Sequence, residues 1–173
     1  MKIIKAIFYI ALIILMIFIF PKSIDGKEFN QDDIEMLNMY MSYNSDEILQ
    51  LINQNGLQIE KLDDTSNNNI TGLYTGDKIL LKDGYIQKSL NHEIGHFVDD
   101  CYKYSQNQEF IKAYNQEKHN LRDYYQDDIE EYFAECYKMY VENWPALNNY
   151  PLTKQFFEEN IKKGENQDNF IFI

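Results

Sequence analysis

The stretch Asn91-His92-Glu93-Ile94-Gly95-His96-Phe97-Val98-Asp99-Asp100 contains the pattern His-Glu-x-x-His and two of the chain's three histidines. Residues four positions apart share one face of a helix, so His92 and His96 can direct both imidazoles at one metal ion. Two neutral imidazoles suit Zn²⁺, which in catalytic sites has a third protein ligand and an open position for water. Glu93, beside the first ligand, is placed to take a proton from that water. The alternative is a surface helix that carries two histidines by chance.

The third ligand is expected from a second helix, over residues 128–140. A metzincin would continue with Gly and His at the positions that Asp99 and Tyr102 occupy, so that pattern is excluded. The other common solution is a glutamate from another helix. Glu131 and Glu135 are four residues apart and share a face. One of them can bind zinc while the other hydrogen-bonds a ligating imidazole.

The chain is strongly acidic, with 28 acidic and 16 basic residues among 173 and a formal net charge of −12. Without the first 22 residues, which carry three lysines and no acid, the net charge is −15. Such a surface repels nucleic acid and anionic membranes, so neither is expected as a partner. The 14 tyrosines and 11 phenylalanines supply apolar surface that a disordered chain lacks. We therefore expect one folded domain, over residues 27–173.

Residues 1–22 begin with Lys2 and Lys5, after which residues 6–20 are all apolar. A basic start followed by an apolar run predicts a secretory signal peptide, and an uncleaved N-terminal anchor is the alternative. In either case the rest of the chain is exported. The protein is then secreted or lies at the cell surface, and any membrane contact is through this segment.

The remaining pattern predicts an α+β fold, in which a small N-terminal sheet or hairpin lobe packs on a helical lobe that carries both motifs. Ser45 caps one predicted helix and Gly56 ends it. The histidine helix is expected over about 90–102, capped by Ser89 or Asn91, and Ala134 is small enough for the glutamate helix to approach it closely. The other predicted elements are a helix at 33–43 and strands at 57–62, 70–74 and 78–82.

The last two strands read as a hairpin directly before the histidine helix. An exposed strand there could bind an extended peptide through backbone hydrogen bonds, or it could be purely structural. A disulfide between Cys101 and Cys136 is allowed in an exported protein, and two buried small side chains are the alternative. His119, the remaining histidine, is expected at the surface.

The histidine motif and the run Glu131-Tyr132-Phe133-Ala134-Glu135 together resemble the anthrax-lethal-factor-like zinc metallopeptidases, whose smaller secreted members include the Pro-Pro endopeptidases. The resemblance spans roughly Gly72 to Lys162. It is specific at the two motifs and loose elsewhere. It implies a zincin-type helical lobe, one Zn²⁺ per chain and peptide hydrolysis.

Carried over by position, the resemblance implies zinc ligands His92, His96 and Glu131, the general base Glu93, and Glu135 as the hydrogen-bond partner of a ligand. The family also has a tyrosine seven residues before its glutamate ligand, which here is Tyr124. A phenol near the metal could hydrogen-bond the oxyanion of a tetrahedral intermediate. Tyr125 lies next to it, so a slip of one residue is an alternative.

The predicted function is that of an exported, monomeric zinc metalloendopeptidase of the gluzincin type, acting on peptides or proteins. The resemblance adds Pro-rich or Pro-Pro sites as a candidate specificity. One alternative is a surface-anchored metal-binding protein or pseudo-peptidase that acts as a binding module. Glu93 and Tyr124 together argue against it, because a structural metal site needs neither. A metal-free structural domain is the other alternative, and it predicts purified protein without zinc.

Overall fold

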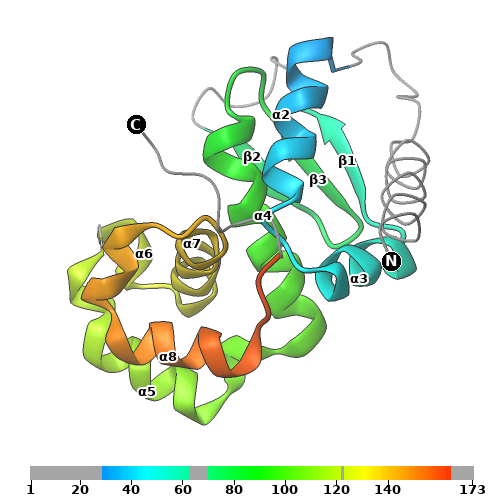
Figure 1. Ribbon diagram of the computed structural model, residues 1–173. Helices are drawn as coiled ribbons and strands as arrows, with labels where there is room; N and C mark the ends of the chain where they lie inside the picture. Colours follow the sequence, from blue (N-terminus) through cyan, green and yellow to red (C-terminus); the bar gives the residue numbers. More distant parts are fainter. Residues whose placement is uncertain (1–28, 63–69, 122, 165–173) are drawn as a thin grey trace.

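The computed structural model describes residues 29–62, 70–121 and 123–164 (Figure 1). The predicted signal or anchor segment lies outside these residues. None of the described helices is long and apolar enough to cross a membrane. The elements, in chain order, are α2 (Gln31–Met41), α3 (Asp46–Asn55), β1 (Gln58–Lys61), β2 (Gly72–Tyr74), β3 (Lys78–Leu81), α4 (Ile86–Tyr102), η1 (Tyr104–Gln106), α5 (Gln108–Glu117), η2 (Lys118–Asn120), α6 (Asp123–Gln126), α7 (Ile129–Val141), η3 (Pro145–Asn149) and α8 (Pro151–Asn160).

Helices α2 and α3 begin at side-chain caps. Asn30 and Asp33 form a reciprocal capping box at the start of α2. The Ser45 hydroxyl accepts from the backbone N–H of Ile48 at the start of α3. Gly56 ends α3 in the left-handed conformation, with φ of 65°, which glycine adopts without strain. The cap and stop predicted for this helix are therefore both confirmed.

The sheet has three strands in the order β1-β3-β2 (Figure 1). Strands β2 and β3 form the predicted antiparallel hairpin, while β1 runs parallel to β3 and pairs Ile59 with Ile79. Ile79 and Leu81 are fully buried and face the hydrophobic core. Within the described residues, β2 has a strand partner on one side only, and it packs on α4. This exposed strand edge therefore borders the helix that carries the histidines.

Helix α4 begins at Ile86 rather than near Leu90, so the prediction that Ser89 or Asn91 caps it is wrong. Both side chains lie buried inside the helix. The turn after β3 closes at Gly84, whose φ is 72°, and the fully buried Ile86 follows almost at once. Burial of Ile86 favours an earlier start than capping preferences alone predict. Asn91 bonds other segments instead: its amide donates to Glu142 Oε1 and it accepts from Asn44 Nδ2.

Helices α4 and α7 cross at Gly95. A Cβ placed on Gly95 would lie 2.8 Å from Ala134 Cα and 3.0 Å from the Ala134 carbonyl oxygen. The two backbones are therefore in contact, and small residues are required on both helices. Ala134 allows the close approach of the two helices that its small size predicts. The need for glycine at position 95 appears only in the structure. This crossing fixes the separation between the histidine helix and the glutamate helix.

We expect Gly95→Ala to destabilise the protein although alanine favours a helix by about 1 kcal/mol. The new methyl meets backbone atoms, so α4 and α7 must separate, and overpacking of this kind costs about 1–3 kcal/mol. Urea denaturation measures the change in the free energy of unfolding. The control is Gln116→Ala on the exposed face of α5, which should change that free energy by less than about 0.5 kcal/mol. An unchanged or higher stability for Gly95→Ala would contradict the crossing described here.

The helical lobe is held by an aromatic core between α5, α7 and α8. Phe110, Phe133 and Phe157 are buried with ring centroids 5.1 to 6.2 Å apart, a spacing typical of stabilising aromatic pairs. Glu117, at the end of α5, accepts from the backbone N–H groups of Leu152 and Thr153 and so caps α8. This packing holds α7, and with it the glutamate side chains, against α4.

Candidate metal centre

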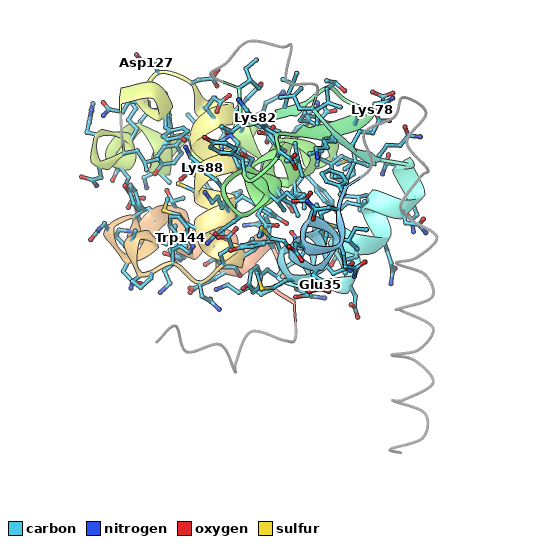
Figure 2. The ribbon with its side chains drawn as sticks, turned by 90° about the horizontal axis from the view of Figure 1, so that it is seen from above. Glu35, Lys78, Lys82, Lys88, Asp127 and Trp144 are labelled. Carbon is cyan, nitrogen blue, oxygen red and sulfur yellow. The ribbon has the colours of Figure 1, made fainter. Side chains whose placement is uncertain are left out.

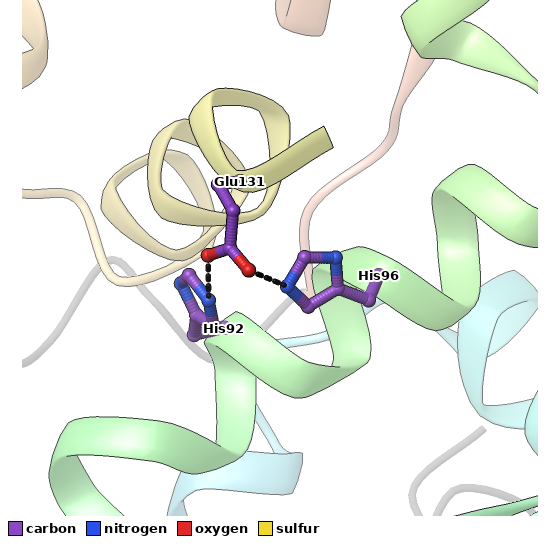
Figure 3. Close-up of side chains that lie close together, drawn as sticks. All are labelled: His92, His96 and Glu131. Atoms are coloured by element: carbon purple, nitrogen blue, oxygen red, sulfur yellow. Dashed lines mark ion pairs between the residues drawn. The ribbon is translucent and has the colours of Figure 1, made fainter. Parts of the chain in front are cut away.

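Helices α4 and α7 bring two imidazoles and one carboxylate together (Figure 3). His92 Nε2 lies 3.2 Å from Glu131 Oε2, and His96 Nε2 lies 3.6 Å from Glu131 Oε1. One ligand atom from each residue fits within a mutual separation of 4.8 Å. Two nitrogens from α4 and one oxygen from α7 form a donor set that suits Zn²⁺. The side chains are 13 to 23% exposed, so the group is partly open to solvent.

The electrostatics of the group favour a cation at its centre. The two imidazoles hold the pKa of the Glu131 carboxyl well below its usual range. At His92, burial alone would lower the pKa, but hydrogen bonds to Glu131 and Glu135 outweigh it and raise the pKa to about 9. The proton that His92 retains therefore balances part of the carboxylate charge, and a divalent cation bound between the same atoms would supply positive charge in its place.

Glu135 lies behind His92, one turn along α7 from Glu131. Its Oε2 is 3.2 Å from His92 Nδ1, so both ring nitrogens of His92 face a carboxylate. A hydrogen bond at Nδ1 leaves Nε2 free to coordinate a metal and orients the ring. The spacing of Glu131 and Glu135 in the sequence does not decide which of them binds the metal and which hydrogen-bonds an imidazole. The distances place Glu131 between the histidines and Glu135 on the far side of His92.

Glu93 is 6% exposed and lies under strand β2. Burial raises the pKa of its carboxyl, an effect opposed by the nearby histidines and by a hydrogen bond from the Tyr74 backbone N–H. A raised pKa brings a carboxylate closer to the range where it exchanges protons efficiently near neutrality. The side chain has room because Gly72 faces it: a Cβ on Gly72 would lie 2.6 Å from Glu93 Oε1.

We expect Gly72→Ala to displace the Glu93 carboxylate. The new methyl would approach both Glu93 Oε1 and, at 2.7 Å, Ser89 Cβ, and the glutamate side chain is the more movable of the two. A shift of about 1 Å in a catalytic group can cost roughly 100-fold in rate. Two quantities are measured. The kcat for a cleaved peptide should fall, and the zinc content should stay constant. Wild-type kcat in this variant would show that β2 does not position Glu93.

Tyr124 belongs to α6, but its side chain lies outside the described residues, so its assigned role stays a prediction. The neighbouring Tyr125 is described, and its ring centroid lies 6.0 Å from that of His92. His119 is exposed, as predicted. Cys101 and Cys136 are both free thiols, so the structure shows no disulfide between them. The alternative of two buried side chains holds for Cys136, which is fully buried, and is wrong for Cys101, which is exposed. Burial raises the pKa of the Cys136 thiol, which keeps it protonated.

The chain is similar to a known protein family and to a solved structure. Residues 76–158 match a family model described as "Anthrax toxin lethal factor, N- and C-terminal domain". Among solved structures, the Pro-Pro endopeptidase PPEP-2 from Paenibacillus alvei matches with a TM-score of 0.66 at 18% sequence identity, over 78% of this chain and 94% of that one. No curated protein matches.

The matched region includes both motif helices, α4 and α7. The similarity to the anthrax-lethal-factor-like metallopeptidases that the two motifs predict is therefore confirmed. The predicted α+β architecture, with a small sheet lobe on a helical lobe, is confirmed as well. These similarities support a metallopeptidase, and a metal ion at the His-His-Glu group.

Proposed function

We propose that this protein is an exported zinc-dependent metalloendopeptidase. The observation that carries the proposal is the convergence of His92, His96 and Glu131 from two helices, with the Glu93 carboxylate buried beside them. We assign the first three as zinc ligands. Glu135 holds the ring of His92. Zn²⁺ bound there supplies a Lewis acid that makes a water molecule nucleophilic near neutral pH.

The remaining chemistry falls to side chains of this chain. Glu93 accepts the proton of the attacking water and passes it to the leaving amine, which requires a carboxylate that is near the scissile bond and only moderately acidic. The hydroxyl of Tyr124, or of Tyr125 after a slip of one residue, donates a hydrogen bond to the oxyanion. The ring of Tyr125 near His92 supports a tyrosine in this region.

Strand β2 is the proposed docking edge for the substrate backbone. It pairs with β3 on one side, and on the other side its Tyr74 N–H points to Glu93. An extended peptide added to this edge would therefore run past the candidate general base. The similarity to a Pro-Pro endopeptidase supports Pro-rich or Pro-Pro sites as candidate substrates. Residues 1–22 would direct export or anchor the protein, and a monomer is the expected form.

The second candidate function is a binding module that keeps the metal but does not cleave. It is tested by incubating the zinc-loaded full chain, in mild detergent, with a degenerate peptide library that is read by mass spectrometry. The proposal predicts cleavage by the zinc-loaded protein and none after chelation. Zinc bound at one equivalent with no cleavage of any peptide would favour the binding module. Protein that takes up no zinc would favour a metal-free domain.

A further inference from the structure

Helices α4 and α7 run antiparallel, and the seam between them continues beyond the candidate metal centre. His96 faces Glu131, and one turn further along His92 faces Glu135. One more turn along, Lys138 Nζ donates to the backbone carbonyl of Lys88 at 2.8 Å. The same seam therefore leads from the metal ligands to a pair of lysines near the start of α4.

These lysines belong to a basic–aromatic patch, which we define as Lys82, Tyr85, Lys88, Lys138 and Trp144. The ammonium groups of Lys82 and Lys88 lie 5.9 and 5.8 Å from the centroid of the Tyr85 ring, and that of Lys138 lies 4.8 Å from the Trp144 ring. Both rings are nearly 40% exposed, although large aromatic side chains gain stability when they are buried. Figure 2 shows Lys82, Lys88 and Trp144 following one another in a row across the view from above.

The positive charge of the patch is not neutralised locally. Among the described residues, no carboxylate forms an ion pair with the three patch lysines. Other lysines, such as Lys61, Lys78, Lys103 and Lys154, are each paired with a carboxylate. Asp83, the nearest acid in the chain to Lys82, is bound to Lys61. Glu142 lies one turn from Lys138, but burial raises the pKa of its carboxyl to about 7, so it offsets that charge only in part. In a chain of net charge −12, Lys82 and Lys88 therefore form a local area of positive surface.

The distance from the metal ligands to the patch matches a few residues of extended peptide. Lys88 and Tyr85 are about 6 and about 10 Å from His92 along the helix axis. A strand advances about 3.3 Å per residue, so roughly the second to fourth residue from the scissile bond would reach the patch.

The direction of the bound peptide follows from the course of β2 when the two pair antiparallel, which is the slightly more stable pairing per residue. Gly72 lies against Ser89, and Tyr74 packs edge-on against Phe97, so β2 and α4 run the same way. A peptide paired antiparallel to β2 would direct its C-terminal residues to the patch.

We propose, on the basis of the peptidase function proposed above, that the basic–aromatic patch binds acidic side chains of the substrate on the C-terminal side of the cleaved bond. Lys82 and Lys88 pair with the carboxylates, and Tyr85 and Trp144 pack on the aliphatic part of the same segment. Lys138 is buried and bonded to the Lys88 carbonyl, so it adds positive charge behind the patch and does not pair with the substrate directly. The preferred substrates are thus peptides with Asp or Glu at the second to fourth position after the scissile bond. Free carboxylates at a peptide C-terminus are not required.

The test compares two C-terminally amidated peptides that share the cleaved core from the library and carry either Glu or Gln at those three positions. For the zinc-loaded full chain in mild detergent, we expect kcat/KM to be about three- to tenfold higher for the Glu peptide, the size expected of a few exposed ion pairs. High salt should reduce that ratio. The double variant K82Q/K88Q should bring the ratio close to one. The control K112Q, at an exposed lysine of α5, should keep the wild-type ratio.

Equal kcat/KM for the two peptides, or a preference that survives in K82Q/K88Q, would overturn the proposal. So would a preference for a free C-terminal carboxylate that the Glu side chains do not reproduce. Cleavage of the Gln peptide by the wild type reports on the peptidase function separately. If neither peptide is cleaved, fluorescence polarisation with labelled Glu and Gln peptides on zinc-loaded Glu93→Ala protein decides the matter. Tighter binding of the Glu peptide that K82Q/K88Q removes supports the patch, and equal binding refutes it.

Discussion

Replacing Glu131 with alanine is expected to abolish tight zinc binding. The carboxylate lies between the two imidazoles, 3.2 Å from His92 Nε2 and 3.6 Å from His96 Nε2, so its removal leaves two ligands on one helix. Loss of a group that merely supports a ligand already costs about 10- to 100-fold in metal affinity, and loss of a ligand should cost more. Elemental analysis and zinc titration measure the change, and peptide cleavage should fall in parallel.

Glu130→Ala is the matched control for Glu131→Ala. Glu130 is exposed and, one position earlier on α7, points about 100° away from Glu131. Both variants remove one negative charge from the first turn of the same helix, so any general effect on charge or helix stability is shared. Zinc affinity should be unchanged in Glu130→Ala. Equal zinc affinity in both variants would remove Glu131 from the proposed ligand set.

Replacing Glu93 with alanine is expected to leave zinc bound and to eliminate most of the turnover. Its carboxylate is not one of the three grouped donor atoms, but it is buried next to them and hydrogen-bonded from Tyr74. A general base contributes about 10²- to 10⁴-fold in rate, so kcat should fall by that factor. Single-turnover assays on a peptide from the library, together with zinc analysis, separate chemistry from metal loss.

Glu93→Gln refines the interpretation of this result, because it keeps the shape and the hydrogen-bond acceptor but cannot take up a proton at the carboxyl. Both variants should be similarly inactive and similarly loaded with zinc. Full activity in Glu93→Ala would refute the proposed mechanism. Full activity in Glu93→Gln alone would reduce Glu93 to a residue that positions other groups.

Much of the scaffold could be predicted from local sequence signals. Ser45 and Gly56 mark the ends of α3 because capping and left-handed backbone are properties of single residues. The hairpin of β2 and β3 is predicted by two apolar runs around a short polar turn. The pairing of the histidine helix with a glutamate helix followed from ligand chemistry, because zinc needs a third donor and the metzincin position is not histidine.

The features that the sequence did not predict depend on contacts between residues that are distant in the sequence. Gly72 and Gly95 look like ordinary glycines in a strand and a helix, and only the positions of Glu93 and Ala134 show why a side chain would clash there. A glycine inside a regular element is a signal of close approach, but it does not name the partner. The parallel pairing of β1 with β3 is equally non-local, because either strand edge satisfies the same alternating pattern.

The start of α4 was missed for a similar reason. Ser89 and Asn91 are good capping residues, but Ser89 Oγ donates to Thr71 Oγ1 and the Asn91 amide donates to Glu142. Polar residues in and beside the candidate metal-binding motif thus bond segments outside α4, at Thr71 before β2 and at Glu142 after α7. Their partners are distant in the sequence, so local preferences assign them to a cap that the helix does not use.

A crystal structure of the full chain grown with zinc, with anomalous diffraction recorded at the zinc absorption edge, tests the central claim most directly. The account predicts one strong anomalous peak about 2.0–2.2 Å from Nε2 of His92, Nε2 of His96 and a carboxylate oxygen of Glu131. A remaining coordination position should be open toward Glu93. No peak between these three side chains, or a peak held by other residues, would contradict the assignment of this site as the metal centre.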